Sequence, residues 1–118
     1  MNCCQEAILG GKMDIENTLI SATQNQQMVE VQFRKETDRD WATREVAPYD
    51  IYDTQDKDGR RRGVLLGYCW EHKGYKAAPI RVYLDTIDNV RLLNKKFDGF
   101  EVRNLIKPRK LPNIPRNW

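Results

Sequence analysis

The chain has 118 residues, a length that corresponds to one domain with short extensions. Hydrophobic residues make up 40% of the composition and charged residues 31%, a balance typical of soluble globular proteins. No apolar stretch approaches the ~20 residues that a membrane-spanning helix requires. Residues 1–12 lack the charged start and the apolar run of a secretory signal. We therefore expect a cytoplasmic protein that binds no membrane.

The net charge of +3 is small, but the charges are unevenly distributed. Residues 103–118 contain five basic residues and no acidic residue, so the rest of the chain is mildly acidic. A basic tail on such a body is suited to nucleic acid or to an acidic protein surface, or it binds nothing.

Cysteine and histidine usage argues against a disulfide framework and against a metal site. The three cysteines, Cys3, Cys4 and Cys69, are an odd number, and a bond between the adjacent pair would be strained. The single histidine, His72, and the cysteine spacing do not supply the ligands of a tetrahedral zinc site. We expect reduced thiols, no metal and no cofactor.

The first regular elements are predicted to be a helix and a strand. Residues 1–12 form an N-terminal extension that ends at two glycines, and the domain follows over residues 13–106. Asp14 can cap a helix over residues 15–23, which places Ile15, Leu19 and Ala22 on one face. Apolar and polar residues then alternate over residues 29–33, the pattern of a strand with one buried face.

Further strands, a hairpin loop and a last short element complete the predicted domain. A strand over residues 43–52 is interrupted at Pro48, which indicates an edge or a bend, and residues 53–63 form an exposed hairpin loop. Residues 64–70 are apolar on both faces and are predicted to form the central strand. Alternation over residues 80–85 predicts another strand, and residues 90–93 either extend it past a bulge or form a separate strand. Residues 97–106 supply a last short element before an extended, basic, proline-containing tail over residues 107–118.

This order of elements predicts a mainly β protein. Several short antiparallel strands after one N-terminal helix favour a small curled β-barrel that the helix plugs or flanks.

Several segments together resemble the WYL domain family. They are a helix at residues 15–22, an alternating strand at 29–33, Arg-x-Val-x-Pro at 44–48, an apolar strand at 65–69 and Arg-x-Tyr-Leu-Asp-x-Ile at 81–87. The resemblance covers roughly residues 13–97 and implies an SH3-like or Sm-like barrel. It also implies a role in transcription regulation, often in defence against phage, with a nucleotide or nucleic-acid ligand on a basic and aromatic face.

The chain departs from the family pattern at two places. Gly63, Val64 and Leu65 stand where the family has Trp-Tyr-Leu, and one residue fewer separates Arg81 from Ile87. No helix-turn-helix pattern precedes the predicted barrel.

The candidate ligand site consists of Arg44, Tyr68, Arg81 and Tyr83, which lie on different predicted strands. Adjacent strands are about 5 Å apart, so these side chains can converge at one mouth of the barrel. Arginine offers a planar fork to phosphate, and tyrosine offers a ring on which a base stacks. The alternative is that Tyr68 packs in the core and that Arg44 pairs with Asp85 or Glu45.

Three other segments carry candidate functional residues. Arg60, Arg61 and Arg62 can bind phosphates from a loop tip, unless nearby aspartates balance them in a solvated hairpin. The tail can dock in a protein partner's groove or simply fray. His72 lies in a charged turn and is expected to be exposed rather than catalytic.

We consider three functions. The first is a ligand-sensing regulatory module that binds a nucleotide or a single-stranded nucleic acid, and the second is an interaction subunit without a small ligand. The third, an enzyme that uses His72 or Cys69, is not expected, because the chain lacks nucleophile, phosphate-loop and paired-carboxylate motifs.

Self-association, as a homo-oligomer, is also expected. A small barrel has exposed strand edges, and Trp41 and Trp118 have no apparent core role. The alternative is that Trp118 folds back over its own barrel.

Overall fold

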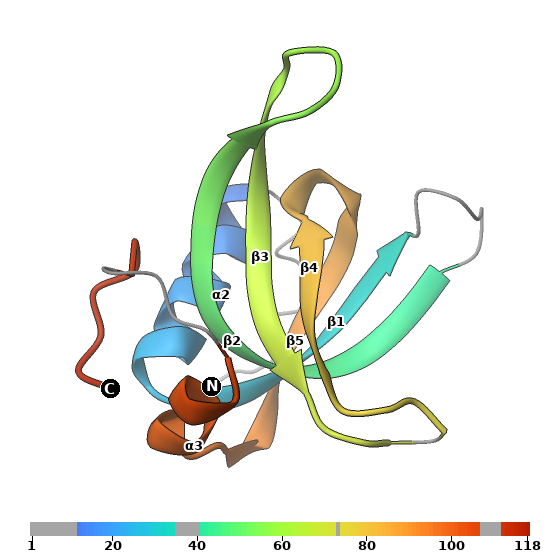
Figure 1. The fold of residues 1–118 in the computed structure, drawn as a ribbon. Coiled ribbons are helices and arrows are strands. Elements are labelled where there is room, and N and C mark those ends of the chain that lie inside the picture. The colour runs from blue at the N-terminus through green and yellow to red at the C-terminus, as the bar shows by residue number, and fades with distance from the viewer. Residues whose placement is uncertain (1–11, 35–40, 73, 107–111) are drawn as a thin grey trace, which may run out of the picture.

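The computed structural model describes residues 12–34, 41–72, 74–106 and 112–118 (Figure 1). The described chain is mainly β, as predicted, with one five-stranded antiparallel sheet in the order β4-β3-β2-β1-β5. Among the described residues, no helix is long and apolar enough to cross a membrane. The elements are α2 (Lys12–Gln24), β1 (Gln27–Arg34), β2 (Trp41–Gln55), β3 (Arg61–Cys69), β4 (Ala78–Tyr83), the short 3₁₀ turn η1 (Leu84–Thr86), β5 (Ile87–Lys96) and α3 (Gly99–Leu105).

Element boundaries differ from the predicted ones in ways that local chemistry explains. Helix α2 already includes Lys12, so Asp14 lies in its first turn and is not the capping residue. The η1 turn separates β4 from β5, which makes residues 90–93 part of a separate strand. The last predicted element is helix α3, whose N-cap Asp98 accepts a hydrogen bond from the Phe100 amide at 3.0 Å.

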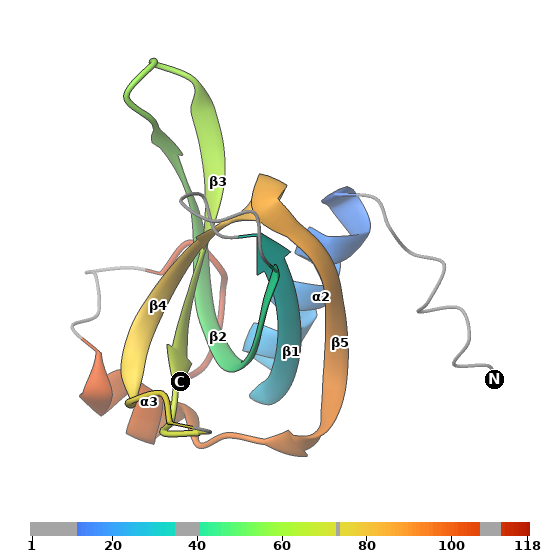
Figure 2. The same cartoon turned by 90° about the vertical axis from the view of Figure 1, so that its right-hand side faces the viewer.

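Strand β2 gives the sheet its curl (Figure 2). Its first half pairs with β1 and its second half with β3, and the register shifts between Pro48 and Asp50. The bend predicted at Pro48 is therefore a β-bulge in the middle of a long strand. In the described residues β4 and β5 each pair on one side only, so the sheet is a loose barrel that does not close. By strand order β2 is central, and β3, predicted as the central strand, lies next to it.

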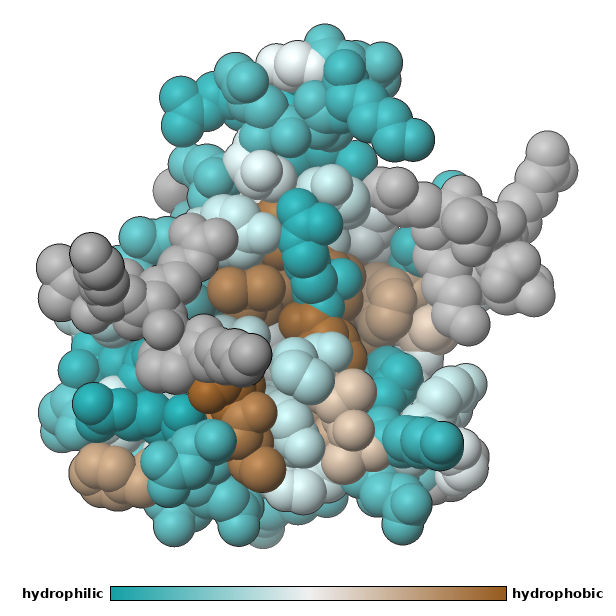
Figure 3. Space-filling model, viewed as in Figure 1, coloured by the Kyte–Doolittle hydropathy of each residue, from teal (hydrophilic) through white to brown (hydrophobic). Residues whose placement is uncertain are grey.

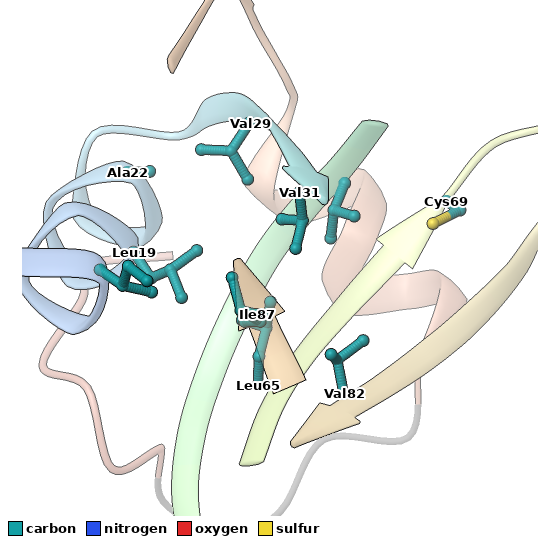
Figure 4. Packing of buried hydrophobic residues seen from close by; sticks show 10 residues of the cluster. Leu19, Ala22, Val29, Val31, Leu65, Cys69, Val82 and Ile87 are labelled. Carbon is teal, nitrogen blue, oxygen red and sulfur yellow. The ribbon is translucent and has the colours of Figure 1, made fainter. Parts of the chain in front are cut away.

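The main core lies on the inner face of the curled sheet, under helix α2 (Figure 4). The predicted helix face of Ile15, Leu19 and Ala22 packs here. Its partners come from all five strands, because alternate residues of each strand point inward. Burial of each large aliphatic side chain contributes about 1.5–3 kcal/mol, which stabilises a helix this short. The sheet residues of this core are Val29, Val31, Val46, Leu65, Cys69, Val82 and Ile87.

A second core lies on the other face of β2 and β3, beneath α3 and the C-terminal segment. Trp118 is its largest member, and only 6% of the residue is exposed. The indole Nε1–H donates to the Thr23 carbonyl at 2.9 Å, and the ring meets Phe97 edge-on at a centroid distance of 5.5 Å. A Cβ on Gly99 would lie 2.5 Å from this ring, so only glycine fits there. Trp118 thus folds back over its own domain. The other members of this core are Met28, Ala47, Tyr68, Val102 and Ile106.

A buried carboxylate anchors the C-terminal segment to the bend in β2. Asp50 is 4% exposed and accepts hydrogen bonds from the amides of Asn113 and Ile114, both at 3.0 Å. It also accepts from the Ile51 amide at 2.9 Å. These charge-assisted bonds satisfy an otherwise costly buried charge, and they fix residues 112–118 against the domain.

Replacement of Trp118 tests whether the C-terminal segment belongs to the folded core. We expect Trp118→Ala to lower the free energy of unfolding by about 3 kcal/mol, because it removes a buried indole and leaves a cavity. Urea denaturation followed by circular dichroism measures the change. The matched control is Trp41→Ala, where the residue is 45% exposed and the expected change is within about 0.5 kcal/mol. Equal effects of the two changes would contradict this description of the core.

Candidate ligand-binding site

The four residues of the predicted site are not brought together. Tyr68 packs in the second core, with its ring edge-on to Trp70 at 5.1 Å, so it is not a stacking surface for a ligand. Arg81 and Tyr83 lie together on the outer face of β4, and Arg44 points to the inner side of β2. The candidate site therefore divides into two places, here called the Arg81 face and the Arg44 pocket.

The register of β2 explains this division. Arg44 lies opposite Val31, a residue of the main core, so its side chain points inward. After the bulge, Tyr52 and Tyr83 both lie level with Val64 on the outer face. The bulge between Pro48 and Asp50 adds one residue to β2. Without that residue, Arg44 and Tyr52 would share a face, because strand side chains alternate with a period of two. The bulge places them on opposite faces.

The Arg81 face consists of Tyr52, Arg62, Arg81 and Tyr83. The Arg81 Nε–H donates to the Tyr52 hydroxyl at 2.9 Å, and its guanidinium carbon lies 5.3 Å from the centre of the Tyr83 ring. The hydrogen bond to Tyr52 raises the pKa of Arg81. Arg81 is exposed, and within the described residues it forms no ion pair with a carboxylate.

Arg62 contributes a second guanidinium to the same face. Its carbon lies 3.5 Å from the centre of the Tyr83 ring, a direct cation–π stack. Asp85 accepts from Arg62 through both carboxylate oxygens, at 2.6 and 3.0 Å, and so fixes the plane of this guanidinium. Asp85 thus pairs with Arg62 and not with Arg44, the alternative partner expected from the sequence.

The other two arginines of the hairpin have local carboxylate partners. Arg60 lies 3.5 Å from Asp56, and Arg61 lies 3.7 Å from Asp53. Hydrogen bonds from the amides of Arg60 and Asp58 lower the pKa of Asp56. The hairpin ends in a hydrophilic projection above the body of the protein (Figure 3). This arrangement fits the solvated-hairpin alternative.

The Arg44 pocket opens between the first half of β2 and the segment after β3. The Arg44 guanidinium carbon lies 4.3 Å from the centre of the Tyr75 ring. Cys69 also lines the Arg44 pocket. Burial raises the pKa of the Cys69 thiol, and the positive charge and hydrogen bond of Arg44 lower it in part. Trp70 and His72 also line this pocket. His72 is exposed, as expected, in a turn where it bridges to Tyr75.

Tyr52 and Tyr75 are site residues that sequence reasoning missed. The face of Tyr52 depends on the bulge at Pro48, and no pattern in the sequence fixes the position of the extra residue. Tyr75 lies in a polar turn whose path is set by the bridge to His72. A tyrosine beside glycine and lysine in such a turn carries no periodic signal.

No metal-binding group is present in the part of the chain that the structure describes, since no three His, Cys, Asp or Glu side chains cluster there. Cys3, Cys4 and residues 107–111 of the tail lie outside the described residues. Of the tail, Ile114 and Trp118 are buried against the domain.

Comparisons with known proteins show that this fold occurs in a solved structure. No protein-family model matches the chain, and no curated protein sequence matches it. The structure is similar to part of proteasome accessory factor B/C (PafBC) of Arthrobacter aurescens, with a TM-score of 0.59 and 13% sequence identity. The match covers 86% of this chain but 14% of the PafBC chain. At this identity the similarity shows a shared fold.

Two tyrosine replacements test the assignment of Tyr68 to the core and Tyr83 to the surface. We expect Tyr68→Ala to lower the free energy of unfolding by about 3 kcal/mol, because its buried ring leaves a cavity. Tyr83→Ala removes a half-buried ring at the edge strand and is expected to cost less than half as much. Thermal and urea denaturation of both variants give these values. A larger loss for Tyr83→Ala would contradict the assignment.

Proposed function

We propose that this chain is a regulatory module that binds a nucleotide or a single-stranded nucleic acid on the Arg81 face. One observation carries the proposal: Arg81 is an exposed cation that two tyrosines hold in place, with no ion pair to a described carboxylate. The bond to Tyr52 uses the Nε–H, and a guanidinium carries further N–H donors on its terminal nitrogens. These donors suit a phosphate, whose oxygens match the planar fork.

The neighbouring stack supplies a surface for the base. The Arg62 guanidinium carbon lies 3.5 Å from the centre of the Tyr83 ring, and Asp85 holds the guanidinium there. Bases stack on aromatic rings and on guanidinium planes with little sequence preference, at about 1–3 kcal/mol per base. A site with one phosphate-binding arginine and one planar stack favours a nucleotide or a single strand over a duplex. Binding at the Arg81 face requires no catalytic group.

The WYL resemblance supports a regulatory setting. Arg81 and Tyr83, which carry part of this resemblance, both lie on the Arg81 face. PafBC has a similar fold over 86% of this chain. We propose on this basis that the ligand acts as a signal in transcription regulation or in defence against phage.

The alternative function is an interaction subunit that assembles with a protein partner or with itself. The observation that favours it is the open sheet, because β4 and β5 each pair on one side in the described residues. Burial of Trp118 removes one of the two tryptophans on which the expectation of self-association rested, and Trp41 remains exposed.

Replacement of Arg81 tests the proposed function. We expect Arg81→Ala to weaken binding of a short single-stranded DNA or RNA, or of a nucleotide, by about 1–3 kcal/mol, because one charge-assisted contact is lost. Arg81→Lys should restore part of the affinity, since lysine keeps the charge without the fork. Fluorescence anisotropy with a labelled oligonucleotide at fixed salt measures these changes.

Two controls separate this site from general electrostatics. Arg103→Ala removes an equal charge from the exposed surface of α3 and should leave affinity nearly unchanged. A variant with glutamine at Lys107, Arg109 and Lys110 removes three of the four basic side chains of the tail and keeps the buried Trp118. If the tail variant loses binding while Arg81→Ala keeps it, the tail binds the nucleic acid and the proposed site is wrong.

A further inference from the structure

We infer that the Arg44 pocket is a second binding site, for a small molecule that carries one phosphate or carboxylate group on an aromatic ring. The pocket holds about 110 Å³ and lies beside the first half of β2, which contributes Thr43, Arg44 and Glu45 to its lining. Thr43, Arg44, Cys69, Trp70, His72 and Tyr75 line it. This inference is independent of the proposed function, which concerns the outer face.

The charges of the pocket favour an anion. Two glutamates, Glu30 and Glu45, also line it, but each forms an ion pair with a lysine or arginine. Glu30 pairs with Arg91 at 3.1 Å, and Glu45 pairs with Lys95 at 2.5 Å. Arg44 forms no ion pair with any carboxylate in the described part of the chain. The Arg44 guanidinium is therefore a positive charge in the pocket wall that no described carboxylate pairs with.

The size of the pocket limits what it can hold. A volume near 110 Å³ is well below the ~300 Å³ of sites that enclose a drug-sized ligand, so it fits one anionic group. A larger hollow of about 360 Å³ adjoins it and shares Glu45, Trp70 and His72 as walls. Met28 and Phe97 give this hollow an apolar floor, on which an aromatic ring can rest.

The rim of the larger hollow disfavours long polyanions. It carries Glu71, Asp98 and Glu101 beside Lys95 and Lys96, so acidic groups outnumber basic ones. A strand of nucleic acid with a phosphate at every nucleotide would meet this acidic rim. A molecule with a single anionic group places that group at Arg44 and presents only its ring to the rest of the hollow. The Arg44 pocket and the Arg81 face thus differ in the ligands they select.

The test uses phenyl phosphate, benzoate and inorganic phosphate with the full chain. The readout is the indole N–H signal of Trp70 in a ¹H–¹⁵N NMR spectrum, assigned with Trp70→Phe. We expect phenyl phosphate and benzoate to shift this signal along a saturating curve, and phenyl phosphate to bind more tightly than inorganic phosphate. Arg44→Gln should weaken phenyl phosphate binding by at least about tenfold.

The matched control is Arg34→Gln. Arg34 is also an arginine stacked on an aromatic ring, 4.7 Å from the centre of Trp41, but it does not line the pocket. Its replacement should leave the titration unchanged. Tyr75→Ala provides a second pocket variant on an exposed turn, for the case in which Arg44→Gln alters the spectrum of the whole domain.

Four outcomes would overturn the inference. They are the absence of a saturable Trp70 shift, equal binding by Arg44→Gln and the unchanged chain, equal weakening by Arg34→Gln, and no preference for phenyl phosphate over inorganic phosphate.

The two proposals fail separately. Loss of phenyl phosphate binding in Arg81→Ala but not in Arg44→Gln would refute the pocket and leave the Arg81 face standing. Loss of oligonucleotide binding only in Arg44→Gln would refute the Arg81 face.

Discussion

The β-bulge between Pro48 and Asp50 is the constraint on which the rest of the structure depends. It lets one strand pair with β1 in its first half and with β3 in its second, which curls the sheet around the main core. An extra residue in a strand also reverses the faces on which all later side chains lie. Arg44 therefore points inward and Tyr52 outward, although their spacing in sequence would place them on one face.

The bend also determines how the outer face is used. Asp50 follows the bulge and collects the amides of Asn113 and Ile114, so the C-terminal segment is held over the lower part of this face. There Trp118 and Tyr68 form the second core. The upper part stays exposed and carries Arg81 with Tyr52 and Tyr83. One face of the sheet thus provides both a hydrophobic contact for the C-terminal segment and the proposed ligand surface.

Local patterns in the sequence were sufficient for the elements but not for their long-range arrangement. Helical spacing of Ile15, Leu19 and Ala22 and alternation around Val31 and Val82 predicted real buried faces, because both patterns depend only on nearby residues. The position of the bulge and the return of Trp118 to Thr23 depend on contacts between distant segments. For that reason the sequence placed Arg81 and Tyr83 correctly on one face. It wrongly grouped Arg44 with them, and it did not reveal Tyr52 as the partner of Arg81.

The most direct test of this account is whether a single-stranded ligand contacts Arg81 without contacting Arg44. The Nε–H signals of the arginine side chains can be followed by ¹H–¹⁵N NMR while a short single-stranded DNA without terminal phosphates is added. The account predicts that the signals of Arg81 and Arg62 shift together and that the signal of Arg44 stays in place. A joint shift of Arg44 and Arg81 with one saturation curve would contradict it, because the two side chains would then share one site.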